Sequence, residues 1–167
     1  MFREMRRSAL YLDKEECESI LRNGSSGVLS VAGDDGYPYG VPISYVYEDG
    51  KIYFHCATTG HKLDAIAKND KVSFCVIGQD QIVQELYTTF FLSVIAFGRA
   101  RVLTDDAERR KALTTLALKY SPDFPDGIKP EIDLKLKGVT CVEITIEHMT
   151  GKGANKLLQA RKAAQQG

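Results

Sequence analysis

The stretch GDDGYPYGVPISYVYEDGKIYFHC, residues 33–56, decides the fold of this chain. Two turns that contain Asp-Gly, GDDG (33–36) and EDGK (48–51), separate runs rich in the β-branched and aromatic residues typical of strands. Because short turns join neighbouring antiparallel strands, this order indicates a meander. The predicted strands of this part are 26–32, 37–47 and 51–56.

The remaining segments add strands and helices that do not alternate as βαβ units do. Capping-box spacing marks two helix starts, with Asp13 three residues before Glu16 and Asp105 three residues before Glu108. Gly98 is a position for a bend or a bulge within the longest strand. The further predicted strands are 71–77, 90–103 and 138–147, the helices are 13–23, 60–68 and 105–120, and the proline-rich segment 121–133 is expected to be a loop.

These elements predict one mainly β domain over residues 1–167, an antiparallel barrel or closed sheet with peripheral helices. A tail begins at about 154, and from Lys156 it is expected to form only a weak, frayed helix. The 167 residues suit a single domain with a sizeable core.

Composition limits the classes of function. The 22 basic and 22 acidic side chains cancel, so no large basic surface for nucleic acid is expected. No apolar run is long enough to span a bilayer, and the start, MFREMRRSALYL, lacks the apolar stretch of a signal peptide. We therefore expect a cytoplasmic protein. Four scattered cysteines without a C-x-x-C pair argue against a disulfide framework and against a metal site.

The start of the helix 60–68 carries two cations where the helix dipole disfavours them. Thr58 or Thr59 is the expected N-cap, so His61 and Lys62 fall in the first turn. Each exposed cation at that end costs about 0.3–1 kcal/mol. An anion bound to the free N–H groups would reverse this cost, and phosphate is the usual one. The alternative is a solvated turn that tolerates the cost.

His55 lies on the outer face of its predicted strand. The period of two places Ile52, Phe54 and Cys56 on one face, which resembles a core face, and His55 on the other. An exposed or interface histidine is one interpretation. The other is a proton donor beside a ligand whose anionic group binds at the start of the helix 60–68.

Two further patterns have a structural and a functional interpretation. Pro42 lacks an N–H group and suits an edge strand, whose unpaired backbone groups could bond a flat heterocycle. Arg99 and Arg101 share one strand face, which indicates a solvated stripe or a row of ion pairs.

The segment GDDGYPYGVPISYVYEDGKIYFHCATTGHKLDAI (33–66) resembles the core of the nitroimidazole-resistance reductases. These belong to the pyridoxamine 5′-phosphate oxidase-like FMN-binding split barrels. MFREMRR at the start and SVIAFGRARVL (93–103) also match, so the resemblance covers residues 1 to about 153. It implies a mainly β fold, a split β-barrel of antiparallel Greek-key type.

The resemblance also implies a homodimer with FMN, or FAD, bound between the subunits. The flavin ring would lie against the strand 41–46 and its phosphate at the turn 58–62. His55 falls on the family's histidine beside the flavin, which is implicated in nitroimidazole reduction, and Lys62 on a basic phosphate-binding position. The chain has no Trp, so an aromatic residue found near the C-terminus of some relatives is missing. The implied cofactor-binding residues are Val41, Pro42, Ser44, Tyr45, His55, Cys56, Ala57, Thr58, His61 and Lys62.

Three functions remain open at this point. The first is an FMN-dependent oxidoreductase that reduces nitroimidazole-type compounds. The second is a non-catalytic flavin- or haem-binding protein, with His55, His61 and His148 as the candidate haem ligands. The third is oxidation of pyridoxamine 5′-phosphate, for which no basic cluster can be assigned to a second phosphate.

Overall fold

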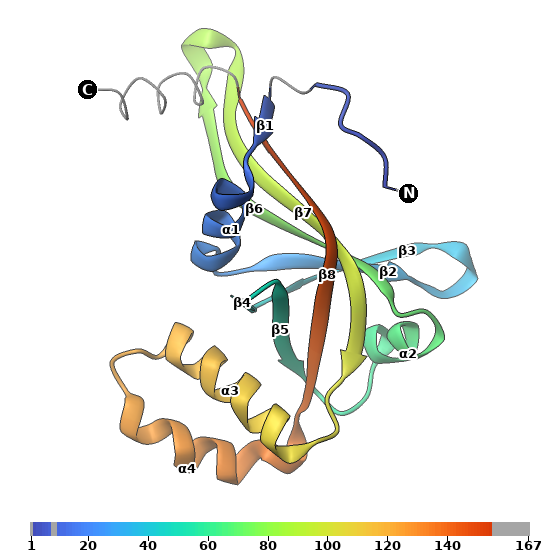
Figure 1. Cartoon of the computed structure of the whole chain (residues 1–167), viewed down its shortest axis with the longest axis vertical. Helices are drawn as coiled ribbons and strands as arrows, with labels where there is room; N and C mark the ends of the chain where they lie inside the picture. The colour runs from blue at the N-terminus through green and yellow to red at the C-terminus, as the bar shows by residue number, and fades with distance from the viewer. Residues whose placement is uncertain (1, 8–9, 155–167) are drawn as a thin grey trace.

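The computed structural model describes residues 2–7 and 10–154 and contains one eight-stranded antiparallel sheet with peripheral helices (Figure 1). Neighbouring strands follow the order β3-β2-β6-β7-β8-β5-β4, and β1 pairs with β8. The strands are β1 (Tyr11–Leu12), β2 (Gly27–Ala32), β3 (Pro38–Ile43), β4 (Val46–Glu48), β5 (Lys51–Cys56), β6 (Lys71–Val83), β7 (Thr88–Val102) and β8 (Thr140–Gly153). The helices are α1 (Lys14–Asn23), α2 (His61–Lys68), α3 (Asp106–Tyr120) and α4 (Pro125–Lys135).

The sheet closes through a bend of the chain. β3 and β4 stand at opposite ends of the strand order, yet only Ser44 and Tyr45 separate them in sequence. The two ends of the sheet therefore meet where one strand leads directly into the next. This corrects the prediction of a continuous strand over 37–47, because the chain must turn there to pass from one edge to the other. The predicted antiparallel barrel with peripheral helices is confirmed.

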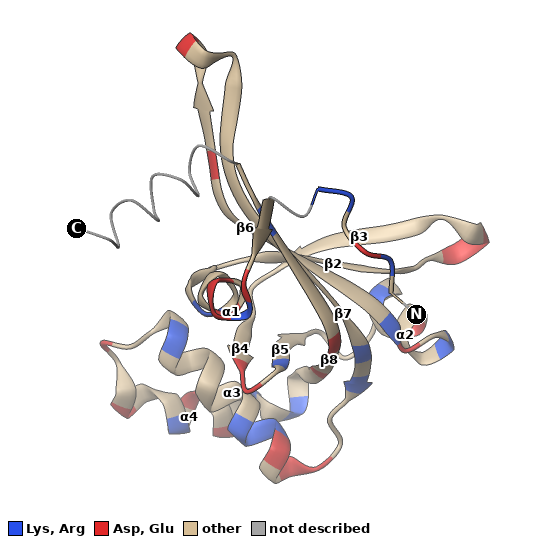
Figure 2. Ribbon diagram, turned by 45° about the horizontal axis from the view of Figure 1, so that its top comes forward, with Lys and Arg blue, Asp and Glu red and all other residues tan. Residues whose placement is uncertain are grey.

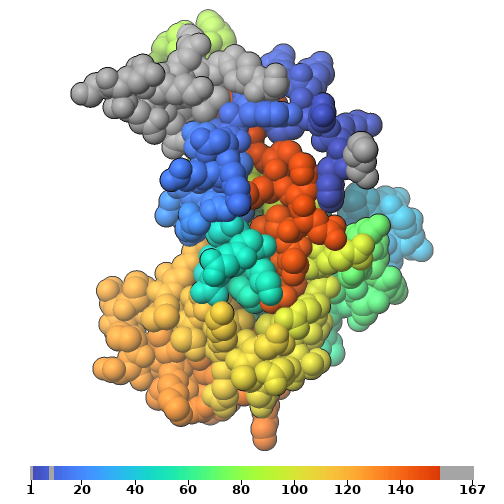
Figure 3. All heavy atoms as spheres, viewed as in Figure 1, coloured from blue at the N-terminus to red at the C-terminus, as the bar shows by residue number. Residues whose placement is uncertain are grey.

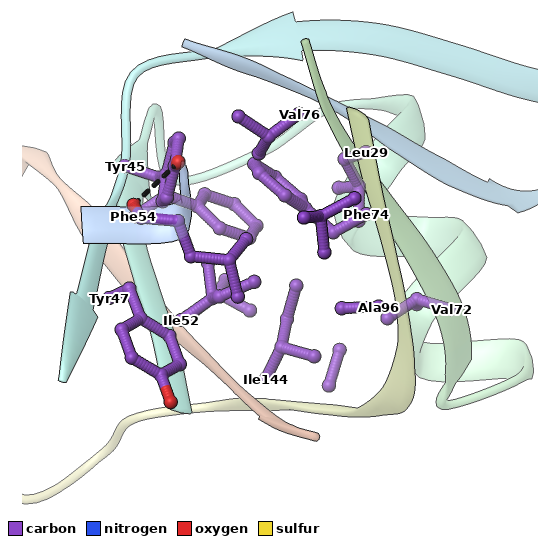
Figure 4. Close-up of a cluster of buried hydrophobic side chains, with 14 of the residues drawn as sticks. Leu29, Tyr45, Tyr47, Ile52, Phe54, Val72, Phe74, Val76, Ala96 and Ile144 are labelled. Carbon is purple, nitrogen blue, oxygen red and sulfur yellow. Dashed lines mark hydrogen bonds between the residues drawn. The ribbon is translucent and has the colours of Figure 1, made fainter. Parts of the chain in front are cut away.

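The core fills the inside of the curved sheet. Leu29, Phe74 and Ile144 come from three strands and are 1% exposed or less, and Figure 4 shows them directed toward the same interior space. On β5, Ile52 and Phe54 are fully buried, which confirms the predicted division of that strand into a core face and an outer face. At about 25 cal/mol per Å² of apolar area, burial of such side chains is the main stabilising contribution.

A β-bulge bends the longest strands where the sequence indicated one. The register between β7 and β8 shifts between Phe97 and Gly98. A Cβ atom on Gly98 would collide with the backbone oxygen of Thr145, so only glycine allows this approach. The bend turns both strands around the core. β6 and β7 also run beyond the barrel as a projecting hairpin, so β6 is longer than the predicted 71–77 (Figure 1).

The predicted loop 121–133 instead contains the helix α4. Pro125 occupies the first turn, where its missing N–H costs nothing. Pro130 lies inside the helix, but Ile132 and Leu136 are buried at its end, and Asp133 pairs with Arg110 of α3 at 2.5 Å. Tertiary packing therefore outweighs the local breakers. The weak helix predicted from Lys156 lies outside the described residues.

The arginines of β7 form the row of ion pairs that was one of the two expectations. Arg99 pairs with Asp70 at 2.9 Å. Arg101 pairs with the buried Glu143 of β8 at 2.8 Å and with Glu108 of α3 at 2.7 Å. Charge thereby links the barrel to the start of α3.

Among the described residues, no helix is long and apolar enough to cross a membrane. That part of the chain also has no group of three or more His, Cys, Asp or Glu side chains that could hold a metal ion.

Candidate functional site

The helix α2 begins with a glycine cap. Gly60 has φ +135°, a conformation that favours glycine, and no side chain caps the helix. The prediction of Thr58 or Thr59 as the N-cap was therefore wrong by one or two residues. The Gly60 carbonyl accepts the N–H groups of Leu63 and Asp64. The first N–H groups of α2 point out of the helix at its positive end, as at any helix N-terminus.

His61 has an acidic partner from the turn between β2 and β3. Its Nε2 lies 3.6 Å from an Asp34 carboxylate oxygen, and its ring packs against Tyr39 with 4.2 Å between centroids. The other Asp34 oxygen accepts a hydrogen bond from Lys68 at 2.9 Å. This hydrogen bond, with the positive charges of Lys68 and His61, lowers the pKa of Asp34. The Asp34 carboxylate thus offsets part of the free-energy cost of placing His61 at the positive end of α2.

Lys62 differs from His61 because the described part of the chain offers its ammonium group no ion pair. It is half-buried and lies near Cys56. Burial raises the pKa of the Cys56 thiol, and the charge of Lys62 opposes that effect without cancelling it. An uncompensated cation therefore stands in the first turn of α2, where an incoming anion would satisfy both the side chain and the helix dipole.

β3 is an edge strand, as predicted from Pro42. It pairs only with β2, so the backbone groups of its other edge have no strand partner. Pro42 is exposed, whereas Val41 is half-buried against the core. Of the implied flavin contacts on this segment, Pro42 and Ser44 are therefore accessible, and Val41 presents mainly backbone.

Tyr45 lies in the core, although the resemblance implied that it touches the cofactor. It is fully buried, and its hydroxyl donates to the Leu21 carbonyl at 2.7 Å. Its ring meets Phe74 edge-on at 4.9 Å (Figure 4). Burial raises the pKa of Tyr45. Its side chain therefore supports the bend between β3 and β4 from beneath.

The end of α3 holds this bend from the other side. The Tyr45 amide donates to the Tyr120 hydroxyl at 2.8 Å, and that hydroxyl lies 2.6 Å from the Ser25 carbonyl oxygen. Lys119 donates to the carbonyls of Gly24 and Tyr45, at 2.6 and 3.0 Å, and lies over the Tyr45 ring. Burial lowers the pKa of Lys119. Sequence analysis missed these residues, for which a Lys-Tyr pair before Ser121-Pro122 is the only local signal.

His55 lies on the outer face of β5, as predicted, but α3 and α4 stand over that face. A pocket of about 390 Å³ separates them, and His55 lines it together with Ser44. Figure 3 shows the atoms of α3, in yellow and gold, packed against the teal hairpin of β4 and β5, and α4 packs against α3. His55 is exposed into this pocket. It is neither an ordinary surface residue nor part of the core.

The sequence-predicted site residues therefore fall into separate groups. Ser44 and His55 share the pocket under α3 and α4, while Cys56 and Lys62 are neighbours at the start of α2. Ala57 and Thr58 are exposed in the connection between these two groups. The three candidate haem ligands lie in different surroundings: His55 in the pocket, His61 beside Asp34, and His148 stacked on Phe2 at 4.6 Å.

A model of the pyridoxamine 5′-phosphate oxidase family matches residues 13–153. The match includes every strand from β2 to β8 and all four helices. The chain belongs to this family. The family assignment made from residues 33–66 is thus confirmed. The search of curated proteins found no match to this chain.

Several solved structures share the fold of this family member. A candidate 5-nitroimidazole antibiotic resistance protein from Bacteroides thetaiotaomicron is 23% identical, with a TM-score of 0.73 and 86% of each chain covered. The flavocytochrome Anf3 from Azotobacter vinelandii is 18% identical, with a TM-score of 0.78 over 90% of this chain and 72% of that one. An FAD-binding protein from Mesorhizobium loti is 26% identical, with a TM-score of 0.60 over 86% and 96%.

Proposed function

We propose that this chain binds a flavin, FMN first and FAD as the alternative, and is an oxidoreductase that reduces nitroimidazole-type compounds. The observation that carries the proposal is Lys62, a cation without an acidic partner in the described structure, in the first turn of α2. Membership of the family and the flavin-binding proteins that share the fold support it. The flavin would supply the electrons, and the chain would bind and orient it.

The residues at the start of α2 fit the flavin phosphate. Lys62 and the free N–H groups of the first turn would bind the phosphate oxygens, and Thr58 offers a hydroxyl group nearby in sequence. Asp34 counts against His61 as a second phosphate ligand, because its carboxylate already faces that ring. The flavin ring would lie along the open edge of β3, where backbone groups and Ser44 are available.

A second copy of the chain would complete the site. The projecting hairpin of β6 and β7 exposes large apolar side chains, with Ile77 at 64%, Ile82 at 74% and Tyr87 at 99%. An apolar surface of this kind favours association. We expect light scattering of the flavin-loaded protein to give twice the chain mass of 18.5 kDa.

Two variants with matched exposure test this association. Ile82→Glu should give a monomer that holds flavin weakly, whereas Leu134→Glu, on the 77% exposed Leu134 of α4, should leave the dimer intact. A stable flavin-loaded monomer of the unaltered chain would contradict the proposal.

His55 is the proposed proton donor. Reduction of a nitro group to a nitroso group consumes two electrons and two protons and releases water. Imidazole is the side chain that most often transfers protons in enzymes, and a general acid of this kind contributes about 10²–10⁴-fold to the rate. The exposed position of His55 at the pocket gives a substrate access to the ring.

The test begins with the absorption spectrum of the purified protein, which distinguishes bound flavin from bound haem or neither. His55→Ala should then keep the flavin and lose about 10²-fold or more of nitroimidazole reduction. His55→Phe keeps an aromatic ring but removes the N–H group that can donate a proton. Loss in both variants supports proton donation, whereas activity retained in His55→Phe assigns His55 a space-filling role. Equal turnover of wild type and His55→Ala at matched flavin occupancy would overturn the proposed role.

A further inference from the structure

Lys119, in the last turn of α3, is a cation that only neutral groups surround at close range. Its ammonium group donates to the carbonyl oxygens of Gly24 and Tyr45, at 2.6 and 3.0 Å. It also lies 4.3 Å from the centroid of the Tyr45 ring. The described part of the chain offers this ammonium group no ion pair. The positive charge of Lys119 is therefore not cancelled by a carboxylate.

The neutral partners hold this charge in place. The negative end of the α3 dipole favours a cation in the last turn, and the carbonyl oxygens and the aromatic face favour it too. Lys119 is half-buried, and burial lowers the pKa of its ammonium group. Because water screens a half-buried charge less than an exposed one, the charge acts on neighbouring groups more strongly.

The charge lies beside the segment that the proposed function assigns to the flavin ring. That segment is 41–46, and it includes Tyr45, whose carbonyl accepts the hydrogen bond from Lys119. The preceding residue, Ser44, is exposed and available to a ligand. Tyr120, the next residue of α3, accepts the Tyr45 amide. The end of α3 thus fixes this segment and brings a positive charge to it.

Support of the bend between β3 and β4 does not by itself require a positive charge. The Tyr120 hydroxyl already joins the Tyr45 amide to the Ser25 carbonyl through a neutral group. A neutral amide side chain could likewise donate to the carbonyls that Lys119 bonds, without the cost of burying an unpaired charge. A group nearby that becomes negative would give the charge itself a role.

A flavin becomes negative when it is reduced. The oxidised ring is neutral, and uptake of two electrons and one proton leaves one negative charge on it. Charged protein groups near the ring tune this reaction. An unpaired cation stabilises the negative ring by Coulomb attraction and acts much less on the neutral one.

We infer that Lys119 raises the reduction potential of the bound flavin, because its positive charge stabilises the reduced flavin more than the oxidised flavin. The inference rests on the proposed function, since it requires a flavin ring against the segment 41–46. It gives α3 an electrostatic role in the site and makes the flavin easier for an electron donor to reduce.

The midpoint potential of the FMN-loaded protein tests the inference, with dithionite as the reductant that is oxidised to sulfite. Lys119→Gln removes the charge and keeps an amide that can donate to the Gly24 and Tyr45 carbonyls. Reduced FMN should then bind at least about tenfold more weakly relative to oxidised FMN. For a two-electron couple this lowers the potential by about 30 mV or more. Lys119→Arg keeps the charge and should stay close to wild type. An unchanged potential in Lys119→Gln, or an equal loss in Lys119→Arg, would overturn the inference.

Two control variants separate the charge from support of the bend. Lys111→Gln makes the same change on α3, at a side chain that is 71% exposed and pairs with Glu48 at 3.3 Å, and should leave the potential unchanged. Tyr120→Phe weakens the same bend without a change of charge and should also leave the potential unchanged. A loss in Tyr120→Phe as large as in Lys119→Gln would overturn the inference. If Lys119→Gln does not fold, Lys119→Met carries the same prediction.

The absorption spectrum of the same samples separates the inference from the proposed function. A purified chain that takes up no flavin when FMN is added contradicts both. A flavin-loaded chain whose potential does not depend on Lys119 contradicts the inference alone and leaves flavin binding intact.

Discussion

The start of α2 and the pocket beneath α3 and α4 are two candidate binding regions built in different ways. The first is local, since the cap, the first turn and the cation Lys62 come from one short stretch of chain. The second draws on β5 and on the helix pair α3 and α4, which follows β5 by about 50 residues in sequence but lines the same pocket (Figure 1). A site formed by one short segment can be recognised from the sequence. A site whose residues come from distant segments can be recognised only once the fold is known.

Charge also distinguishes the two regions. Along α3 and α4, acidic and basic residues alternate closely, as Figure 2 shows, and several of them pair, including Arg110 with Asp133 and Lys135 with Glu131. At the start of α2, Asp34 pairs with His61 and Lys68, and Lys62 has no ion pair within the described structure. The difference predicts an anionic ligand group at the start of α2.

The largest expected effect concerns how firmly each region belongs to the fold. Leu116 is 5% exposed under α3, so Leu116→Ala should lower the free energy of unfolding by about 2–5 kcal/mol. Leu63 on α2 is only half-buried, so Leu63→Ala should cost less, about 1 kcal/mol. Urea unfolding measures both. Equal losses would remove the distinction between the buried position of Leu116 and the half-buried position of Leu63.

A smaller effect is expected where α3 holds the bend between β3 and β4. Tyr120→Phe removes the hydroxyl that accepts the Tyr45 amide, and should cost about 1–3 kcal/mol of unfolding free energy. Tyr37→Phe is the control, because Tyr37 is 76% exposed and should change stability by less than about 0.5 kcal/mol. A Tyr120→Phe variant as stable as wild type would show that the Tyr120 hydroxyl does not support this bend.

The smallest effect concerns the charge link from barrel to α3. Burial alone raises the pKa of Glu143, but hydrogen bonds from Arg101 and Lys51 outweigh it and leave this pKa below the ordinary 4.5. A carboxyl with a lowered folded-state pKa stabilises the fold above its unfolded-state pKa, and this contribution is lost as pH falls through the folded-state value.

Glu143→Gln should therefore cost about 1 kcal/mol at pH 7, because its two partners remain partly exposed to water. The difference between the variant and wild type should shrink as pH falls below 4.5. Urea unfolding across this pH range measures it. A difference that stays constant with pH would show that ionised Glu143 does not stabilise the link.

The sequence was informative wherever a short pattern determines the structure. The alternation in 51–56 predicted that His55 leaves the core, and Pro42 predicted an edge strand. The proline and glycine residues of 121–133 concealed α4, because its stability comes from Ile132 packing and from a partner on α3. The pocket could therefore not be predicted from the sequence, because its walls come together only when α3 and α4 pack.

Tyr45 shows a second limit of sequence analysis. The resemblance placed it at the cofactor, yet its hydroxyl bonds Leu21 inside the core. A strand bend reverses the alternation of faces, and the sequence of this segment does not mark where that bend falls. The role of Lys119 and Tyr120 depends on the same bend and could not be predicted either.

FMN affinity with and without the unpaired cation tests the central claim most directly. Kd is measured by flavin fluorescence for wild type, Lys62→Glu and Lys71→Glu; the last makes the same charge change at the exposed start of β6. Loss of a charge-assisted phosphate contact costs about 1.5–3 kcal/mol, so Kd should rise about 10- to 150-fold in Lys62→Glu alone. An unchanged Kd in Lys62→Glu, or an equal rise in Lys71→Glu, would contradict a flavin phosphate at the start of α2.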